Sequence, residues 1–284
     1  MLRKISTIDF RSSNTTSGKT VLIRVDYNVP VENERVLDDY RILKSIPTIK
    51  YCLEKGSKVV LMSHMGRPDV KVENNLSLIP AGEKLAELLE MPIKFSNDCI
   101  SEDAIDVSRN LKDGEIHLLE NLRFYDQETS NDEIFASQLA KHGSIYINDA
   151  FSCSHRKHAS VHSITNFIPS YSGIQLELEV NSLKKITESI ERPISCVIGG
   201  SKISTKISVI KNMISKFDNI IFVGGMANNI LKFKNYEIGK SIYEENCKNI
   251  ISEIFDLCKK NNCKIFLPYD VKVGKNTKDK SIIK

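Results

Sequence analysis

Short apolar runs alternate with longer stretches of helical periodicity along the first part of this chain. The runs are rich in Val, Ile and Leu, and they lie within residues 21–28, 59–68, 116–125 and 144–158. Such runs are typical of strands buried on both faces of a parallel sheet. We therefore expect a sheet whose central strands are enclosed by helices.

The stretches between the runs have helical spacing. Apolar residues recur every three or four positions from Asp39 to Gly56, around Leu85 up to Pro92, and again from about Asn131. Asp favours helix starts, whereas Gly and Pro end helices. The alternation of strands and helices predicts a doubly wound α/β sheet with right-handed crossovers.

A second series of the same kind follows a helix-forming stretch. Its predicted strands and helices lie at 194–198, 204–217, 219–223, 244–260 and 264–268. We expect two Rossmann-like lobes, at 1–172 and 192–284, joined by a connecting helix at 173–191. The second lobe is incomplete in this reading, because its sheet stops after a third strand. Strand 264–268 is then an unpaired edge, which predicts a less stable second lobe.

Composition narrows the class of protein. With 284 residues, of which 41% are hydrophobic, the chain has enough apolar material for two cores. A net charge of +4 is too small to indicate a nucleic-acid or membrane partner. No apolar run reaches the roughly 18 residues of a membrane span. The seven cysteines lack the paired spacing of a metal site, which favours reduced thiols in a cytoplasmic protein.

Basic side chains follow the ends of the predicted strands. Because the carboxyl ends of parallel strands meet at one edge of a sheet, these side chains should form a single rim. They are Arg24, His64, Arg67, Arg123 and Arg156. Guanidinium groups match phosphate oxygens in a bidentate way, so the rim predicts a small, strongly anionic ligand.

Other polar residues near the rim have two interpretations each. Asp26 and Asn28 follow the first strand, where they either cap a turn or bind a hydroxyl and a carboxylate of a short acid. Arg41 lies on the first helical turn, where a positive charge gains nothing from the helix dipole. It is either a solvated helix arginine or a ligand contact. His64 is either a buried core histidine or an anion ligand.

Eight motifs, in order and at compatible spacing, resemble those of the phosphoglycerate kinases. They are RVDYNVP, DDYRI, MSHMGRP, LLENLRFY, NDAFSCSHRKHAS, IGGSKISTKISVI, VGGMANNIL and IGKS. The resemblance implies a bilobal, monomeric enzyme of glycolysis that transfers a phosphoryl group between 1,3-bisphosphoglycerate and ADP. It also implies that 3-phosphoglycerate binds the first lobe, and that ADP or ATP with Mg²⁺ binds the second.

The resemblance also implies roles for particular residues. The residues expected to bind the phosphoglycerate are Asp26, Asn28, Arg41, His64, Arg67, Arg123 and Arg156. Those expected to bind the nucleotide are Gly199, Gly200, Lys202, Lys206, Gly224 and Gly225. Among these, Arg41 and Lys202 are the expected catalytic residues, because both would stabilise charge on the transferring phosphoryl group.

The chain departs from the family in two ways. Val223 stands where the family usually has another glycine, next to the pair expected to make room for adenine. The segments that supply the ribose-binding glutamate and the magnesium-binding aspartate have no counterpart in this sequence, so we expect no metal ligand within it. A phosphoglycerate-binding remnant without catalysis, or one half of a split enzyme, is therefore the alternative to an active kinase.

Overall fold

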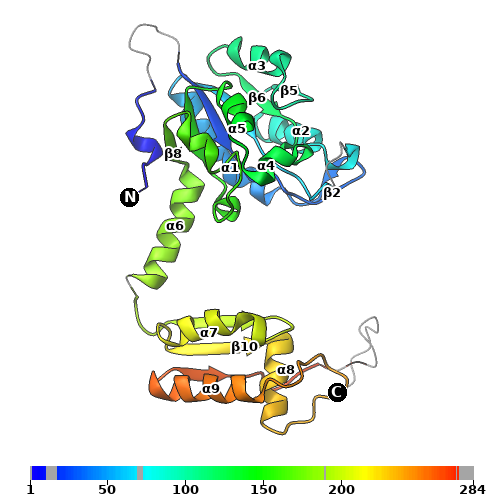
Figure 1. Cartoon of the computed structure of the whole chain (residues 1–284), viewed down its shortest axis with the longest axis vertical. Helices are drawn as coiled ribbons and strands as arrows, with labels where there is room; N and C mark the ends of the chain where they lie inside the picture. Colours follow the sequence, from blue (N-terminus) through cyan, green and yellow to red (C-terminus); the bar gives the residue numbers. More distant parts are fainter. Residues whose placement is uncertain (1, 11–17, 69–72, 189, 273, 275–284) are drawn as a thin grey trace. The chain divides into compact units, whose positions relative to one another are not determined.

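The computed structural model describes residues 2–10, 18–68, 73–188, 190–272 and 274 (Figure 1). It divides into two compact units, residues 1–182 and 183–284, which we call the first unit and the second unit. The division falls within helix α6, Ile174–Thr187. This helix occupies most of the stretch that the sequence analysis expects to connect two lobes.

A six-stranded parallel sheet forms the centre of the first unit, with strand order β5-β6-β4-β1-β7-β8. The strands are β1 Thr20–Arg24, β4 Lys58–Met62, β5 Ile93–Ser96, β6 Ile116–Leu119, β7 Ile145–Asn148 and β8 Ser170–Ser172. The four strands expected from apolar runs are therefore adjacent in space. A two-stranded antiparallel hairpin, β2 Val31–Glu32 with β3 Arg35–Val36, lies outside this sheet.

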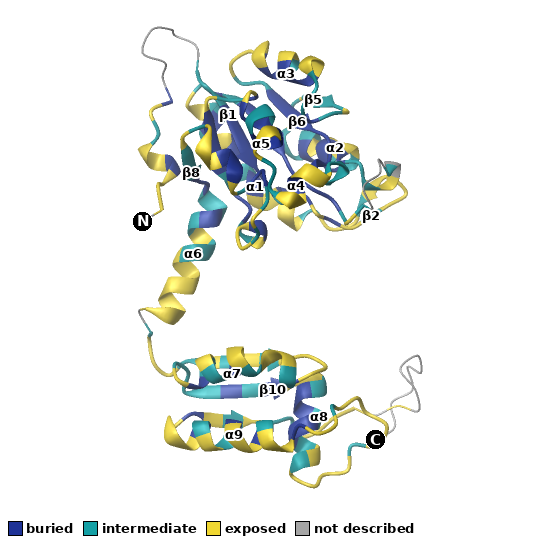
Figure 2. Ribbon diagram, in the orientation of Figure 1, coloured by how far each residue is buried: buried dark blue, intermediate teal, exposed yellow. Residues whose placement is uncertain are grey.

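Alternate residues of β1 point to different cores. Val21 and Ile23 join a cluster that includes residues of α1 and α2, whereas Leu22 joins a second cluster that includes residues of α5. Side chains of successive strand residues point to opposite faces, so helices cover both faces of the sheet. Figure 2 shows β1 and β6 as buried. The predicted doubly wound α/β fold is confirmed.

The helices of the first unit are α1 Tyr40–Glu54, α2 Ile79–Leu89, α3 Glu102–Arg109, α4 Asp126–Ser130 and α5 Glu133–Ala140. Three of them, α1, α2 and α5, lie close to the helical stretches that the sequence predicts. The N-cap of α5 is Asp132, whose carboxylate accepts the Phe135 amide at 2.7 Å. Helices α3 and α4, the hairpin β2–β3 and the short strands β5 and β8 were not predicted. Each of these elements has eight residues or fewer and few buried apolar residues, so it leaves only a brief signal in the sequence.

Two buried histidines of the first unit share one serine hydroxyl. His142 Nε2 donates to the carbonyl oxygen of Cys99 at 2.9 Å, because a carbonyl can only accept. Nδ1 of the same ring then accepts from Ser108 Oγ at 2.7 Å, and Ser108 Oγ accepts from His117 Nδ1 at 2.8 Å. His117 Nε2 accepts from Ser96 Oγ at 2.8 Å. Each ring nitrogen of the two neutral histidines thus has a hydrogen-bond partner.

The second unit contains a three-stranded parallel sheet with order β11-β10-β9. Its elements are β9 Ser195–Gly199, α7 Ile207–Ile214, β10 Asn219–Val223, α8 Gly224–Phe233, α9 Lys248–Lys260 and β11 Lys264–Phe266. Residues of all three helices pack in one cluster with Ile220 and Phe222. Helix α8 was not predicted, because it starts with two glycines, which disfavour a helix.

Strand β11 pairs only with β10 among the residues that the structure describes. The expected unpaired edge is therefore present in that part of the chain. Val197 of β9 and Phe266 of β11 both oppose Ile221 in the register, and they are 64% and 47% exposed. One face of this small sheet thus exposes apolar side chains in the described residues. No helix in the described part of the chain is long and apolar enough to cross a membrane.

Candidate functional site

Four loops that follow the strands β1, β4, β6 and β7 carry the residues expected to bind an anion. These strands are neighbours in the sheet and run parallel, so the four loops leave the same edge. Asp26 and Asn28 follow β1, His64 and Arg67 follow β4, and Arg123 follows β6. The loop after β7 holds Arg156, as well as Ser152 and His158.

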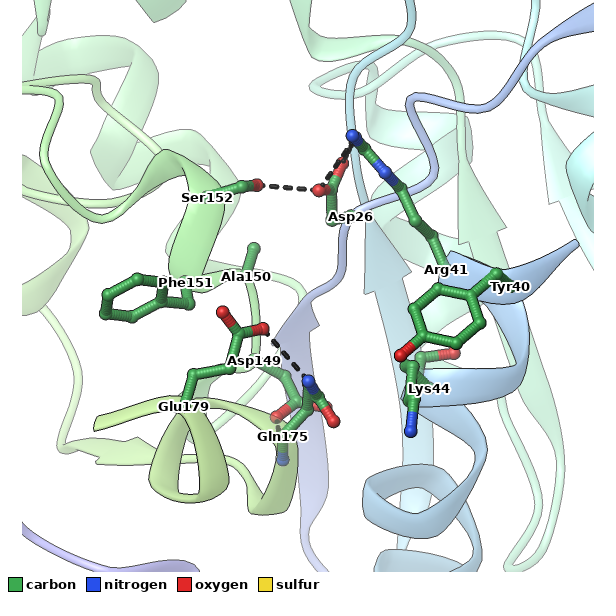
Figure 3. A pocket seen from close by; sticks show the side chains of 11 residues that line it. Asp26, Tyr40, Arg41, Lys44, Asp149, Ala150, Phe151, Ser152, Gln175 and Glu179 are labelled. Atoms are coloured by element: carbon green, nitrogen blue, oxygen red, sulfur yellow. Dashed lines mark hydrogen bonds and ion pairs between the residues drawn. The ribbon is translucent and has the colours of Figure 1, made fainter. Parts of the chain in front are cut away.

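Arg41 and Asp26 form an ion pair at the end of β1. The guanidinium Nη1 lies 3.1 Å and 3.0 Å from the two carboxylate oxygens of Asp26. Ser152 Oγ donates to the same carboxylate at 2.6 Å (Figure 3). The side chain of Arg41 is 47% exposed, whereas that of Asp26 is 15% exposed. Arg41 is therefore accessible to a ligand from solvent, while Asp26 is largely covered.

Gly66 joins the loops that follow β1, β4 and β6. Its amide donates to Asn28 Oδ1 at 2.9 Å, and its carbonyl accepts from Arg123 Nη1 at 2.6 Å. The residue has φ +62°, and a Cβ there would lie 2.7 Å from a side-chain carbon of Leu76. Only glycine fits such a turn without strain. The MSHMGRP motif thus places Asn28 and Arg123 on the two peptide groups that flank the Gly66 Cα.

The cationic groups converge around His64, which is 4% exposed. Burial lowers the pKa of His64 far below its ordinary value, and Arg24, Arg123, Arg156 and His158 lower it further. Burial and then Arg156 likewise lower the pKa of Arg123. Charges act on a neighbouring pKa mainly over short distances. Three of the basic residues expected at one rim, His64, Arg123 and Arg156, therefore do share one region.

Arg24 does not lie on the rim, which corrects the sequence analysis. Its side chain is 1% exposed, and its Nε donates to Ser160 Oγ at 3.1 Å. Its Nη2 lies 2.9 Å from His64 Nδ1. Arg24 is the last residue of β1, a strand enclosed on both faces, so its side chain enters the core. It supports His64 instead of facing solvent.

Arg67 is exposed and follows the Gly66 turn. Among the described residues, it is not in bonding contact with the other expected site residues. Arg156 is half-buried and acts on His64, Arg123 and His158 through its charge. The structure therefore brings Arg123 and Arg156 together and leaves Arg67 at the margin.

Three potential metal ligands meet in this region. One ligand atom each of Asp26, His64 and Cys153 lies within 4.8 Å of the others. Their surroundings oppose a cation, because Arg24 occupies His64 Nδ1 and Arg41 occupies the Asp26 carboxylate. The same positive charges favour an anion.

A pocket of about 380 Å³ opens beside the Asp26–Arg41 pair (Figure 3). Helix α1, residues 149–152 and helix α6 line it. Asp149 is 5% exposed, and its Oδ1 accepts the amides of Gln175 and Leu176 at the start of α6. Burial raises the pKa of Asp149 to about 7. Asp149 thus fastens α6 to the loop that follows β7.

Some residues that shape the site were missed by the sequence analysis. Ser152 donates to Asp26, and Asn121 holds the loop after β4 through the backbone of Met65, at 3.2 Å and 2.8 Å. Asn121 lies in the LLENLRFY motif, two residues before Arg123, directly after a buried strand. Its position in this motif could have indicated from the sequence that Asn121 belongs to the site. Ser152 carries no comparable signal, because serine is common in loops.

In the second unit, two glycine turns lie against each other. Gly199 and Gly200 end β9, Gly224 and Gly225 begin α8, and the Met226 amide donates to the Gly200 carbonyl at 2.8 Å. A Cβ at Gly225 would lie 2.9 Å from that carbonyl oxygen. The backbone of Gly200 and Ser201 therefore fills the space that a side chain at position 225 would need.

The lysines expected at the nucleotide site, Lys202 and Lys206, are exposed near the start of α7. Between them, the amide of Ser204 donates to Glu244 Oε2 at 3.0 Å, and its hydroxyl donates to Oε1. These bonds, from the hydroxyl first, lower the pKa of Glu244, and Lys202 adds to the effect. A carboxylate of the chain itself thus occupies these donors.

Comparison with known proteins shows the same family throughout. The phosphoglycerate kinase family model matches residues 12–284. The chain belongs to the phosphoglycerate kinase family. It is 43% identical over 278 residues to the phosphoglycerate kinase of Dictyoglomus turgidum, covering 98% of this chain and 70% of that protein. It is 46% identical over 260 residues to that of the Wolbachia of Culex pipiens, covering 92% and 65%.

Solved structures of phosphoglycerate kinases agree with the fold. The enzyme from Coxiella burnetii superimposes with a TM-score of 0.82 at 31% identity, covering 100% of this chain and 70% of that one. The enzyme from Pyrococcus horikoshii gives a TM-score of 0.74 at 27% identity. The chain therefore spans about 65 to 70% of the length of the curated phosphoglycerate kinases described above.

Proposed function

We propose that the chain carries out, or contributes to, reversible phosphoryl transfer between 1,3-bisphosphoglycerate and ADP, giving 3-phosphoglycerate and ATP. The observation that supports this most is the convergence of His64, Arg123 and Arg156 beside the Asp26–Arg41 pair. A three-carbon acid with a phosphate needs a cationic site for the phosphate and separate polar groups for its hydroxyl and carboxylate. The first unit offers both within neighbouring loops.

Each residue of the first unit has a proposed task. Arg123 and Arg156, with Arg67 at the margin, bind the phosphate that is not transferred. Asp26 and Asn28 orient the hydroxyl and the carboxyl end. Arg41 leaves Asp26 and binds the carboxylate or acyl phosphate, where its charge stabilises the transferring group. Phosphoryl transfer depends mainly on positioning and charge, so a nucleophilic side chain is not needed.

The second unit is proposed to bind the nucleotide. ADP or ATP is placed at the glycine turns of Gly199, Gly200, Gly224 and Gly225, with Lys202 and Lys206 near its phosphates. Lys202 would neutralise the phosphoryl group in flight. For Mg²⁺, which the family's nucleotides carry, the described residues of the second unit contain no group of three acidic, His or Cys side chains that could hold it.

A second candidate is binding of phosphoglycerate without catalysis, either as a remnant or as one half of a split enzyme. The Glu244 carboxylate favours it, because it satisfies the Ser204 amide and hydroxyl between the two expected nucleotide lysines. An anionic nucleotide would have to displace or avoid this carboxylate. The partner of a split enzyme would be a polypeptide that supplies the remaining third of the relatives' length.

A coupled assay with MgATP and 3-phosphoglycerate separates the two candidates. It is run on the full chain alone and with a polypeptide corresponding to the last third of a relative. Turnover by the chain alone supports an active kinase, and turnover only in the second arm supports one half of a split enzyme. Calorimetric binding of 3-phosphoglycerate without turnover in both arms supports the binding protein.

The proposed setting is the cytoplasm, and the proposed state is a monomer. All seven cysteines are free thiols, as expected of a protein in a reducing compartment. Sedimentation of the purified chain tests the monomer, and fractionation of the native cell tests the compartment.

A further inference from the structure

A buried carboxylate lies near His64, Arg123 and Arg156, the group of basic residues that we call the anion site, and takes no part in the roles assigned above. Glu128 of α4 is fully buried. It accepts the amide of Ser160 at 2.9 Å and the hydroxyl of Ser160 at 2.6 Å. Its backbone carbonyl accepts the Ala159 amide at 2.9 Å. Glu128 therefore fixes the end of the loop that carries Arg156 and His158.

Glu128 also reaches His64 through two intermediate groups. Because Ser160 donates its hydroxyl hydrogen to Glu128, its oxygen is free to accept from Arg24 Nε at 3.1 Å. Arg24 Nη2 then donates to His64 Nδ1 at 2.9 Å. A guanidinium can only donate, so Nδ1 of His64 is the acceptor and its proton lies on Nε2. The bonds fix one tautomer of His64.

Several basic groups lie near His64 in this region. Arg24, Arg123, Arg156 and His158 all act on His64. Arg24 makes no direct ion pair with a carboxylate among the described residues. Glu128 acts on Arg24 through the Ser160 hydroxyl, and its Oε1 lies 3.7 Å from His158 Nδ1. Burial raises the pKa of Glu128, but Arg24 lowers it, which indicates a mutual stabilisation of the two charges.

We propose that Glu128 is a positioning residue for the anion site: it holds the loop of Arg156 and, through Ser160 and Arg24, orients His64. The inference rests on the proposed function, since it concerns the same group of basic residues. It predicts that removing the charge of Glu128 weakens anion binding although Glu128 does not touch the ligand.

The test compares variants of the full chain by calorimetry with 3-phosphoglycerate and with inorganic phosphate. Glu128→Gln keeps the size of the side chain but removes its charge and one of its two acceptors, so the Ser160 amide can keep its acceptor while the Ser160 hydroxyl loses the carboxylate oxygen. Both ligands should bind about tenfold more weakly, because Arg24, His64 and the Arg156 loop are then positioned less firmly. Glu133→Gln is the matched control, because Glu133 is exposed on α5 and loses the same charge.

A second readout separates positioning from general destabilisation. In ¹H–¹⁵N NMR spectra of the imidazole nitrogens, His64 of the unaltered chain should carry its proton on Nε2. Glu128→Gln and Ser160→Ala should both produce a mixture of tautomers, whereas Glu133→Gln should not. Ser160→Ala also serves if Glu128→Gln does not fold, because it breaks the link to Arg24 and keeps the Ser160 amide bond.

The outcomes distinguish this inference from the proposed function. If the unaltered chain binds phosphate but not 3-phosphoglycerate, and Glu128→Gln weakens the phosphate, the proposed function is wrong and the inference stands. Equal affinities of the unaltered chain and Glu128→Gln, or of Ser160→Ala where Glu128→Gln does not fold, overturn the inference alone. Binding of neither ligand overturns both.

Discussion

Mild acid should destabilise the first unit through its two buried histidines. His117 and His142 share the Ser108 hydroxyl inside the first unit, where burial opposes a positive charge on either ring. Burial lowers the pKa of His117 to about 3 and that of His142 to about 4. In the unfolded chain, both should titrate near 6.5.

The sign and size of the effect follow from these values. Below pH 6.5 the unfolded state binds protons that the folded state does not, so the free energy of unfolding falls as the pH falls. Each histidine contributes about 1.4 kcal/mol per pH unit, from pH 6.5 down to its folded pKa. Between pH 7 and pH 5 the pair should therefore remove about 4 kcal/mol. Above pH 6.5 both states bind the same number of protons at these rings, so this loss of unfolding free energy is absent.

Urea denaturation followed by far-ultraviolet circular dichroism measures this at pH 7, 6 and 5. Peptide-resolved hydrogen exchange assigns the transition to the first unit. The double variant His117→Gln/His142→Gln should lose about 4 kcal/mol less over this range than the unaltered chain, whatever its stability at pH 7. His162→Gln, at an exposed position, is the control. Parallel pH profiles of the unaltered chain and the double variant would refute the reasoning.

Four further outcomes are expected. Arg123→Ala should weaken 3-phosphoglycerate binding in calorimetry by about 2 to 5 kcal/mol, whereas Arg109→Ala, an exposed arginine of α3, should not. If the chain is catalytically active, Lys202→Ala should lower kcat far more than KM in the coupled assay, because the contact of Lys202 with the phosphoryl group strengthens during transfer. Equal effects on kcat and KM would indicate ground-state binding. Limited proteolysis should cleave the second unit, with its exposed apolar sheet face, before the first; the reverse order would contradict this. Gly225→Ala should lower the thermal midpoint of the second unit, because its Cβ meets the Gly200 carbonyl; an unchanged midpoint would show that the turns separate freely.

The sheet could be predicted from the sequence because its central strands are buried on both faces. Val59 to Met62 and Ile116 to Leu119 are buried at each position, so their composition signals a strand without any partner being known. Strand β8 lacks this signal, since its three residues include two serines. Its place depends on pairing with β7, which no local pattern reveals.

The site could be predicted in part for a related reason. Strand order places loop residues at one edge, so the grouping of His64, Arg123 and Arg156 follows from topology. The direction in which a side chain points does not follow from topology. For this reason Arg24 was expected at the rim but is buried. It ends a strand whose two faces are both covered, and hydrogen bonds to Ser160 and His64 make its burial possible. These partners lie 136 and 40 residues away in the chain.

Calorimetric titration of 3-phosphoglycerate into the full chain most directly tests whether His64, Arg123 and Arg156 form an anion-binding site. The account predicts saturable binding to one site, which weakens as salt is added and is lost in the double variant Arg123→Ala/Arg156→Ala. Absence of binding at millimolar ligand, or binding that the double variant retains in full, would contradict it.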